Sequence, residues 1–173
     1  MVSWTSNALD SADHPHVSYF DYNNRDLKCA SWNGTVWSIE TIDSVGDVGW
    51  WPAIAVDLDD NIHISYWNMD NNALMYARSN ESDWDIEEVD RLSGEECMIS
   101  IDIDSMSRPH ISYAGQYLRY AKWDGTKWNK EIVDSAGFTE YQTIAKIALD
   151  SFDRPHISYY DKTNGDLKYA WFG

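Results

Sequence analysis

A tetrapeptide, His-Ile/Val-Ser-Tyr, occurs four times in this chain, and its even spacing restricts the fold more than any other feature. The four copies begin at His16, His63, His110 and His156, in steps of 47, 47 and 46 residues. An aspartate precedes each histidine by six residues, at Asp10, Asp57, Asp104 and Asp150. A fixed period of this length is the mark of a supersecondary unit repeated in tandem.

Each repeat contains four short segments that read as β-strands. In the second repeat these are residues 54–56, 63–66, 74–77 and 84–90, which are rich in β-branched and aromatic residues and bounded by Gly, Asn, Asp or Pro. Four antiparallel strands in about 47 residues form one blade of a β-propeller. We therefore predict an all-β propeller whose blades each run through strands A, B, C and D.

The boundaries follow from the repeat. We expect a single domain over residues 1–173, with blades at about 1–43, 44–90, 91–134 and 135–173. Gly173 is level with Gly34 of the first repeat, so the fourth blade should lack its outer strand D. The edge of its strand C would then carry unpaired backbone groups, which proteins usually cover. We expect a homodimer that closes an eight-bladed ring, with a four-bladed monomer as the alternative.

Charge excludes several kinds of partner. Asp and Glu number 29 against 13 Lys and Arg, which gives a net charge of −16. Such a protein repels phosphate backbones, so we expect neither nucleic acid nor an anionic membrane as a partner. The sequence shows no signal peptide and no apolar stretch of membrane-spanning length, and it predicts a soluble protein of undetermined compartment. Cys29 and Cys97 have neither disulfide-framework nor zinc spacing.

The repeated histidines and aspartates are expected to be structural. A residue that recurs in every blade is spread around the ring, so the four histidines should not meet at one atom, and each should bond a nearby aspartate or backbone group. The cluster Asp57, Asp59, Asp60 and Asn61 departs from the EF-hand pattern and suits a tight turn. We predict no metal, no cofactor and no catalytic residue.

The remaining candidate surface lies at the B–C and D–A loops, where aromatic residues stand beside carboxylates or amides. A ring can stack on the C–H groups of a sugar while a polar neighbour bonds its hydroxyls. The alternative is that these rings only pack blade against blade. The predicted ligand-binding residues are Asp21, Trp50, Trp51, Trp67, Asn68, Tyr141, Tyr160 and Asp161.

The predicted function is therefore non-enzymatic binding of a glycan or another neutral polar ligand. Two alternatives stay open at this stage. One is a glycoside hydrolase or lyase that uses acidic residues of the same surface. The other is a structural segment of a larger propeller assembly.

The turn between strands C and D resembles that of Asp-box, or BNR-type, propellers. The residues are Trp32-Asn33-Gly34-Thr35-Val36-Trp37 and Trp123-Asp124-Gly125-Thr126-Lys127-Trp128. The polar residue here directly precedes the glycine, which departs from the family's spacing. The resemblance implies a propeller in which this turn is structural and lies away from the binding surface. The repeat length is also similar to that of tachylectin-like sugar-binding propellers.

Overall fold

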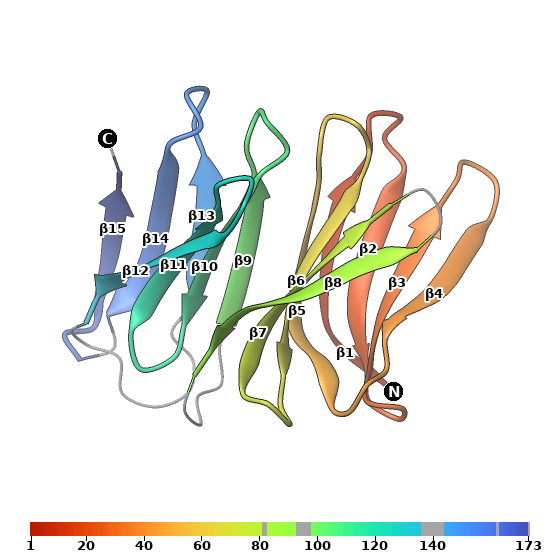
Figure 1. The fold of residues 1–173 in the computed structure, drawn as a ribbon, viewed down its shortest axis with the longest axis horizontal. Coiled ribbons are helices and arrows are strands. Elements are labelled where there is room, and N and C mark those ends of the chain that lie inside the picture. Colours follow the sequence, from red (N-terminus) through yellow and green to blue (C-terminus); the bar gives the residue numbers. More distant parts are fainter. Residues whose placement is uncertain (81–82, 93–97, 136–143, 162, 173) are drawn as a thin grey trace. The chain divides into compact units, whose positions relative to one another are not determined.

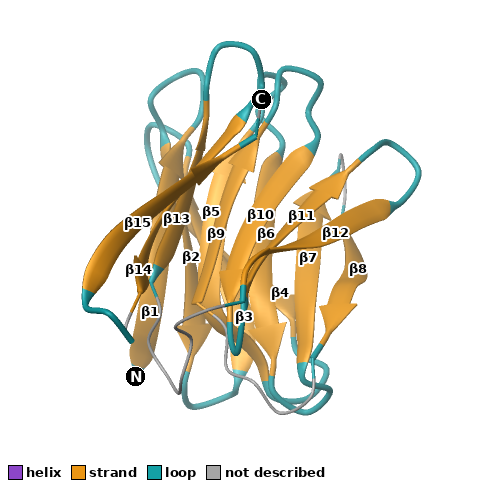
Figure 2. Ribbon diagram, turned by 90° about the vertical axis from the view of Figure 1, so that its left-hand side faces the viewer, coloured by secondary structure: helices purple, strands orange, loops and turns teal. Residues whose placement is uncertain are grey.

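In the computed structural model the described residues are 1–80, 83–92, 98–135, 144–161 and 163–172. They form four antiparallel sheets and no helix (Figures 1 and 2). The chain divides into two compact units, Met1–Gly94 and Glu95–Gly173, and each unit contains two sheets. The prediction of an all-β chain of sequential four-stranded blades, the last with three strands, agrees with this topology.

The sheets follow the sequence without crossovers, and we number the blades 1 to 4 in chain order. Blade 1 consists of β1 (Val2–Leu9), β2 (Pro15–Asp21), β3 (Asp26–Trp32) and β4 (Trp37–Asp43). Blade 2 consists of β5 (Val48–Val56), β6 (Ile62–Asn68), β7 (Ala73–Ser79) and β8 (Trp84–Arg91). Blade 3 consists of β9 (Met98–Ile103), β10 (Pro109–Ala114), β11 (Leu118–Trp123) and β12 (Trp128–Asp134). Blade 4 consists of β13 (Ala145–Leu149), β14 (Pro155–Asp161) and β15 (Asp166–Trp171).

The tetrapeptide forms strand B of each blade, and its side chains alternate between the two faces of the sheet. We call the face with the His and Ser the front face and the face with the Ile or Val and the Tyr the back face. In the first unit the front face of blade 1, with Leu27 and Cys29, packs against Ile64 and Tyr66 on the back face of blade 2. In the second unit Leu118 and Tyr120 of blade 3 pack in the same way against the back face of blade 4.

The histidines bond within their own blades, as the sequence analysis expects. In blade 2, Nε2 of His63 lies 3.2 Å from Oδ2 of Asp57, and Nδ1 lies 2.6 Å from the hydroxyl of Tyr76. Asp104, His110 and Tyr120 repeat this arrangement in blade 3, with distances of 3.4 and 2.7 Å. Each network ties strands A, B and C together and satisfies polar groups that are buried in the sheet.

Blade 1 departs from this network at one position. Cys29 occupies the place of the tyrosine, and Nδ1 of His16 instead lies 2.9 Å from Oγ of Ser31. Burial raises the pKa of the Cys29 thiol to about 11, so the thiol stays protonated and acts as a small core residue.

Two similar sets of bonds join the blades within each unit. The hydroxyl of Tyr66 donates to Asp43 at 2.6 Å in the first unit, and the hydroxyl of Tyr159 donates to Asp134 at 2.8 Å in the second. The hydroxyls of Ser6 and Ser100 each accept a hydrogen bond of 3.3 Å from strand A of the next blade. The donors are the backbone amides of Ile54 and Ile147. The two units are thus copies of one two-blade design.

Candidate functional site

Four aromatic rings of the first unit form a continuous cluster at the end of the sheets where strand A begins. The ring of Trp4 lies 4.9 Å from that of Trp50 and 5.6 Å from that of Trp51, between centroids. Phe20 lies 4.6 Å from Trp50 and forms the buried base of the cluster. Trp4 is exposed and Trp50 and Trp51 are half-buried, so the cluster presents aromatic surface to solvent. We call these four residues the aromatic cluster.

The backbone at two of these tryptophans is strained. Trp4 has a φ of 46° and Trp51 a φ of 47°, in the left-handed region that bulky residues rarely adopt. Both stand six residues before the aspartate of their blade, and the ladder of strand A is irregular at both places. Such a conformation costs about 1–3 kcal/mol per residue and clusters at functional sites. It turns both indoles toward each other instead of leaving them in the regular alternation of a strand.

A chain of polar groups adjoins the cluster. The indole N–H of Trp50 donates a bond of 2.5 Å to Oδ1 of Asp47, and Oδ2 of Asp47 pairs with the guanidinium of Arg25. The side chain of Arg25 is well exposed, whereas that of Asp47 is mostly covered. An exposed guanidinium next to a carboxylate offers both donors and acceptors to a polyhydroxylated ligand.

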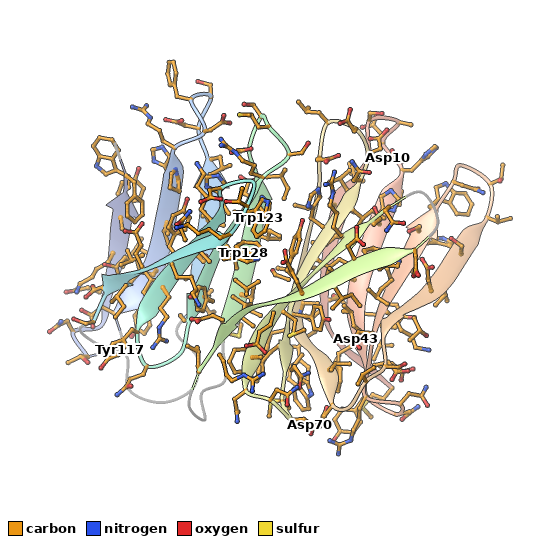
Figure 3. The ribbon with its side chains drawn as sticks, in the orientation of Figure 1. Asp10, Asp43, Asp70, Tyr117, Trp123 and Trp128 are labelled. Carbon is orange, nitrogen blue, oxygen red and sulfur yellow. The ribbon has the colours of Figure 1, made fainter. Side chains whose placement is uncertain are left out.

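Two bonds from backbone amides fix the loop that holds these groups, and the first of them joins blade 2 to blade 1. The amide of Val48 donates to the carbonyl of Arg25 at 3.1 Å, and the amide of Asp47 donates to Oδ2 of Asp70 at 3.0 Å. Figure 3 shows Asp70 at the opposite end of this unit from Asp10, which marks the A–B turn. The aromatic cluster and its polar groups therefore belong to the B–C and D–A end of the unit.

Gly49 allows strand A of blade 2 to approach blade 1. Its φ is +93°, and a Cβ added there would lie 2.7 Å from Cα and 2.8 Å from the nitrogen of Leu27. Only glycine fits this close approach of two backbones. The position of the tryptophans that follow thus depends on a residue without a side chain.

Two polar atoms in the strands beside the cluster are buried without a hydrogen-bond partner among the described residues. They are Oγ of Ser3, which is opposite Phe20 in the ladder, and Nε1 of Trp67, which is opposite Trp50. A buried polar atom left unsatisfied costs about 1–3 kcal/mol. Ser3 lies on β1 next to Trp4, and Trp67 lies on β6, which pairs with the strand that carries Trp50 and Trp51.

The structure places the predicted site residues in different environments. Trp50 and Trp51 belong to the aromatic cluster. Trp67 is completely buried, so its ring offers no surface to a ligand in this structure. Tyr160 of blade 4 is exposed on the front face of its sheet, in the other unit. Tyr141 lies outside the described residues.

The predicted polar residues serve as turn caps. Asn68 accepts a bond from the amide of Asn71 at 3.1 Å, and Asp21 accepts one from the amide of Asn23 at 3.1 Å. Asp161 is buried and holds Lys168 at 2.7 Å, an interaction that lowers the pKa of its carboxyl to about 2. These side chains follow an aromatic residue directly within a strand, so each points to the opposite face from that ring. The structure does not bring the two members of such a pair together.

Sequence reasoning missed Trp4, Arg25 and Asp47. The signal for Trp4 was present, because it occupies the same position before Asp10 as Trp51 does before Asp57. The equivalent residues in blades 3 and 4 are Met98 and Ile144, so the tryptophan pair is a property of the first unit. No pattern in the sequence marked Arg25 or Asp47, whose pairing depends on how blades 1 and 2 pack.

The polar residue before the glycine of each of these C–D turns has a structural role. Asp124 accepts bonds from the amides of Thr126 and Lys127 at 2.8 and 3.0 Å, and Asn33 does the same for Thr35 and Val36 at 3.0 Å. Figure 3 shows Trp123 and Trp128 beside this turn, and their ring centroids are 5.5 Å apart. The polar residue before each glycine therefore caps a turn.

The described residues contain no group of three or more His, Cys, Asp or Glu side chains placed to hold a metal ion. A membrane-crossing helix, which must be both long and apolar, is not found in the part of the chain that the structure describes.

Comparisons with known proteins give a fold and no family. No family model and no curated protein matches the chain. Solved structures do match. A mutant of AofleA from Arthrobotrys oligospora has a TM-score of 0.72 at 14% identity, over 98% of this chain and 56% of that one. The Aleuria aurantia lectin, described as a six-bladed β-propeller with a novel mode of fucose recognition, has a TM-score of 0.70 at 14% identity.

The match to the Aleuria lectin covers 99% of this chain and 60% of the lectin. The lectin SapL1, solved with α-methyl fucoside, has a TM-score of 0.58 at 15% identity, over 98% of this chain and 63% of that one. This chain thus spans less than two thirds of the length of these proteins. The likeness establishes a β-propeller-like fold.

Proposed function

We propose that this chain is a non-enzymatic carbohydrate-binding protein, and that a sugar stacks on the aromatic cluster of the first unit. The observation that carries the proposal is the pair Trp4 and Trp51, two indoles held 5.6 Å apart by backbones in the left-handed conformation. A core aromatic needs no such strain, because a regular strand already points alternate side chains inward. The strain is understandable where two rings must face a ligand.

The polar groups beside the cluster suit a neutral sugar. Arg25 donates and Asp47 accepts, so together they can bond neighbouring hydroxyls while the indoles cover a C–H face of the ring. A net charge of −16 disfavours phosphorylated or carboxylated ligands at long range. The solved structures of similar fold that are described as lectins were studied with fucosides, which makes fucose the first sugar to test.

The experiment uses the purified chain on a glycan array and then calorimetry with α-methyl-L-fucoside and any stronger array ligand. Two variants address the site: Trp4→Ala, at an exposed ring, and Trp51→Gly, which removes the indole and tolerates the positive φ. Trp37→Ala is the matched control, because Trp37 is an exposed tryptophan at the C–D turn of the same unit.

We expect both site variants to lose sugar binding by at least about tenfold, since a stacked ring contributes more than about 1.4 kcal/mol. The control should bind as the parent does, and thermal melting should show that all three variants fold. Unchanged binding in both site variants would place the sugar elsewhere. A glycan array without any bound sugar would reject the proposed function itself.

A further inference from the structure

The same contact between a serine and an aspartate joins the two blades in each unit. Ser11 follows the repeated aspartate of blade 1, Asp10, and its amide and hydroxyl bond the carboxylate of Asp60 in blade 2 at 2.8 and 2.7 Å. Ser105 of blade 3 bonds Asp153 of blade 4 in the same way, at 2.9 and 2.5 Å. We call this contact between neighbouring A–B turns the Ser–Asp clasp. It fixes the register of one blade on the next.

Blades 1 and 4 each carry one half of this clasp that meets no other half among the described residues. Ser151 of blade 4 stands where Ser11 and Ser105 stand, one residue after the repeated aspartate. Asp13 of blade 1 stands where Asp60 and Asp153 stand, three residues after it. The φ of Asp13 is 62°, against 63° for Asp60 and 61° for Asp153, so its backbone already has the clasp conformation.

The front face of blade 4 has the residues of a blade interface but is exposed among the described residues. Leu167 is 82% exposed, whereas its equivalents Leu27 and Leu118, each covered by the next blade of its unit, are 0% exposed. Tyr169 is 59% exposed, against 6% for Tyr120. Apolar surface of this kind, arranged as in two buried interfaces, marks an interaction site.

The back face of blade 1 is the complementary surface. Val17 and Tyr19 are only half-buried, whereas their equivalents Ile64 and Tyr66 are fully buried against the preceding blade. Ile39 on the same face is exposed. A blade with this face and with Asp13 offers both the apolar surface and the carboxylate that blade 4 lacks.

We propose that blade 4 binds blade 1 of a second copy of this chain, and that Ser151 and Asp13 form a third Ser–Asp clasp across the contact. Two copies related by a two-fold axis can make two such contacts. One bond of the internal junctions is missing here, because Lys146 stands where Ser6 and Ser100 accept a backbone bond. The contact between copies is therefore weaker than the junctions within a unit.

Sedimentation equilibrium on the full chain tests the proposal. We expect a species of twice the chain mass of 20.0 kDa at micromolar concentration, in reversible equilibrium with the monomer. A clean monomer up to high concentration would overturn the proposal, since it would mean that these faces are not used between copies.

Point variants test the surface. Leu167→Asp places a charge in the contact, and we expect the dimer to weaken by more than about tenfold, because an apolar side chain is lost and a carboxylate is buried. Met106→Asp is the control, since Met106 is an exposed apolar residue of the same unit at an A–B turn. Leu167 is exposed in the monomer, so circular dichroism should show both variants folded. A dimer equally stable in both would place the contact elsewhere.

A pair of substitutions tests the clasp itself. Ser151→Asp sets one carboxylate against that of Asp13 and should weaken the dimer by about threefold to tenfold. Adding Asp13→Ser restores a serine–carboxylate pair and should recover part of the loss. If the double variant associates no better than the single one, Ser151 and Asp13 do not meet and the proposed register is wrong.

Discussion

The hydroxyl of Tyr66 donates a hydrogen bond of 2.6 Å to Oδ2 of Asp43, across the junction of the first two blades. Tyr66 is fully buried, and burial together with the nearby carboxylate raises the pKa of its hydroxyl far above the usual value. We predict that Tyr66→Phe lowers the free energy of unfolding by about 1–3 kcal/mol, because Asp43 loses a buried donor. Urea denaturation measures this change.

The second unit provides the comparison. Oδ2 of Asp134 accepts from Tyr159 at 2.8 Å and also lies 3.3 Å from Nζ of Lys168. Tyr159→Phe should therefore cost less than Tyr66→Phe, since Asp134 keeps a charged partner. Equal losses in the free energy of unfolding would mean that the charged partner of Asp134 does not compensate for the lost hydroxyl.

Two buried histidines predict how stability depends on pH. Burial lowers the pKa of His63 and of His110 below 6.5, and it outweighs the opposing effect of Asp57 and Asp104. In the unfolded chain both histidines take up a proton near pH 6.5, while in the folded chain they stay neutral to lower pH. The unfolded state then binds more protons, so stability is complete above that pH and declines below it.

We expect the free energy of unfolding to fall by at most about 1.4 kcal/mol per pH unit for each histidine as the pH drops from about 7.5 to about 5.5. Urea denaturation at a series of pH values gives the slope. The double variant His63→Gln, His110→Gln should be less stable at pH 7 and should show a shallower slope. A slope identical to that of the parent would assign the effect to other groups.

Gly49 and Gly125 form a matched pair for a third prediction. Both have positive φ, +93° and +100°, but a Cβ at Gly125 would meet no atom within 4 Å, whereas one at Gly49 would clash with the backbone of Leu27. Gly125→Ala should cost about 1–2 kcal/mol from the backbone alone. Gly49→Ala should cost more than about 3 kcal/mol and should also weaken sugar binding, because Trp50 and Trp51 follow it. Equal melting temperatures for the two variants would contradict this ranking.

The acidic A–B turns predict that a chelator has no effect. Oδ1 of Asp57 accepts bonds from the amides of Asp59 and Asn61 at 3.0 and 2.9 Å, so the carboxylate is occupied by the turn itself. We expect EDTA to change the melting temperature by less than about 1 °C. A drop of many degrees would show that an ion holds one of these turns, and adding calcium back would then identify it.

The repeat predicted the strands because it fixes both their spacing and their faces. His63 and Tyr66 are two landmarks of one strand, and their alternation with Ile64 and Ser65 already determines which residues face the neighbouring blade. The three-stranded fourth blade followed from comparing the position of Gly173 with that of Gly34.

The site was harder to predict, because its geometry depends on packing between blades. Trp50 and Trp51 were identified from their loop, but local sequence shows neither the left-handed backbone of Trp51 nor the close approach of Gly49 to Leu27. The rings after the tetrapeptide were placed in loops, whereas β2 and β6 extend through Phe20 and Trp67 and carry both inward. An aromatic residue followed by Asp or Asn fits the end of a strand as well as a loop, so local composition does not decide between the two.

The alternation of the tetrapeptide has a consequence for how such chains evolve. Ile64 and Tyr66 complete the contact with the blade before, while the front-face residues Leu27 and Cys29 show how a blade receives the one after. Blade 1 thus supplies a front face and blade 2 a back face that fit each other, and blades 3 and 4 repeat this pairing. A gene segment that encodes one two-blade unit can be duplicated with its internal junction intact. The number of units in such a chain can therefore change while the junction inside each unit stays the same.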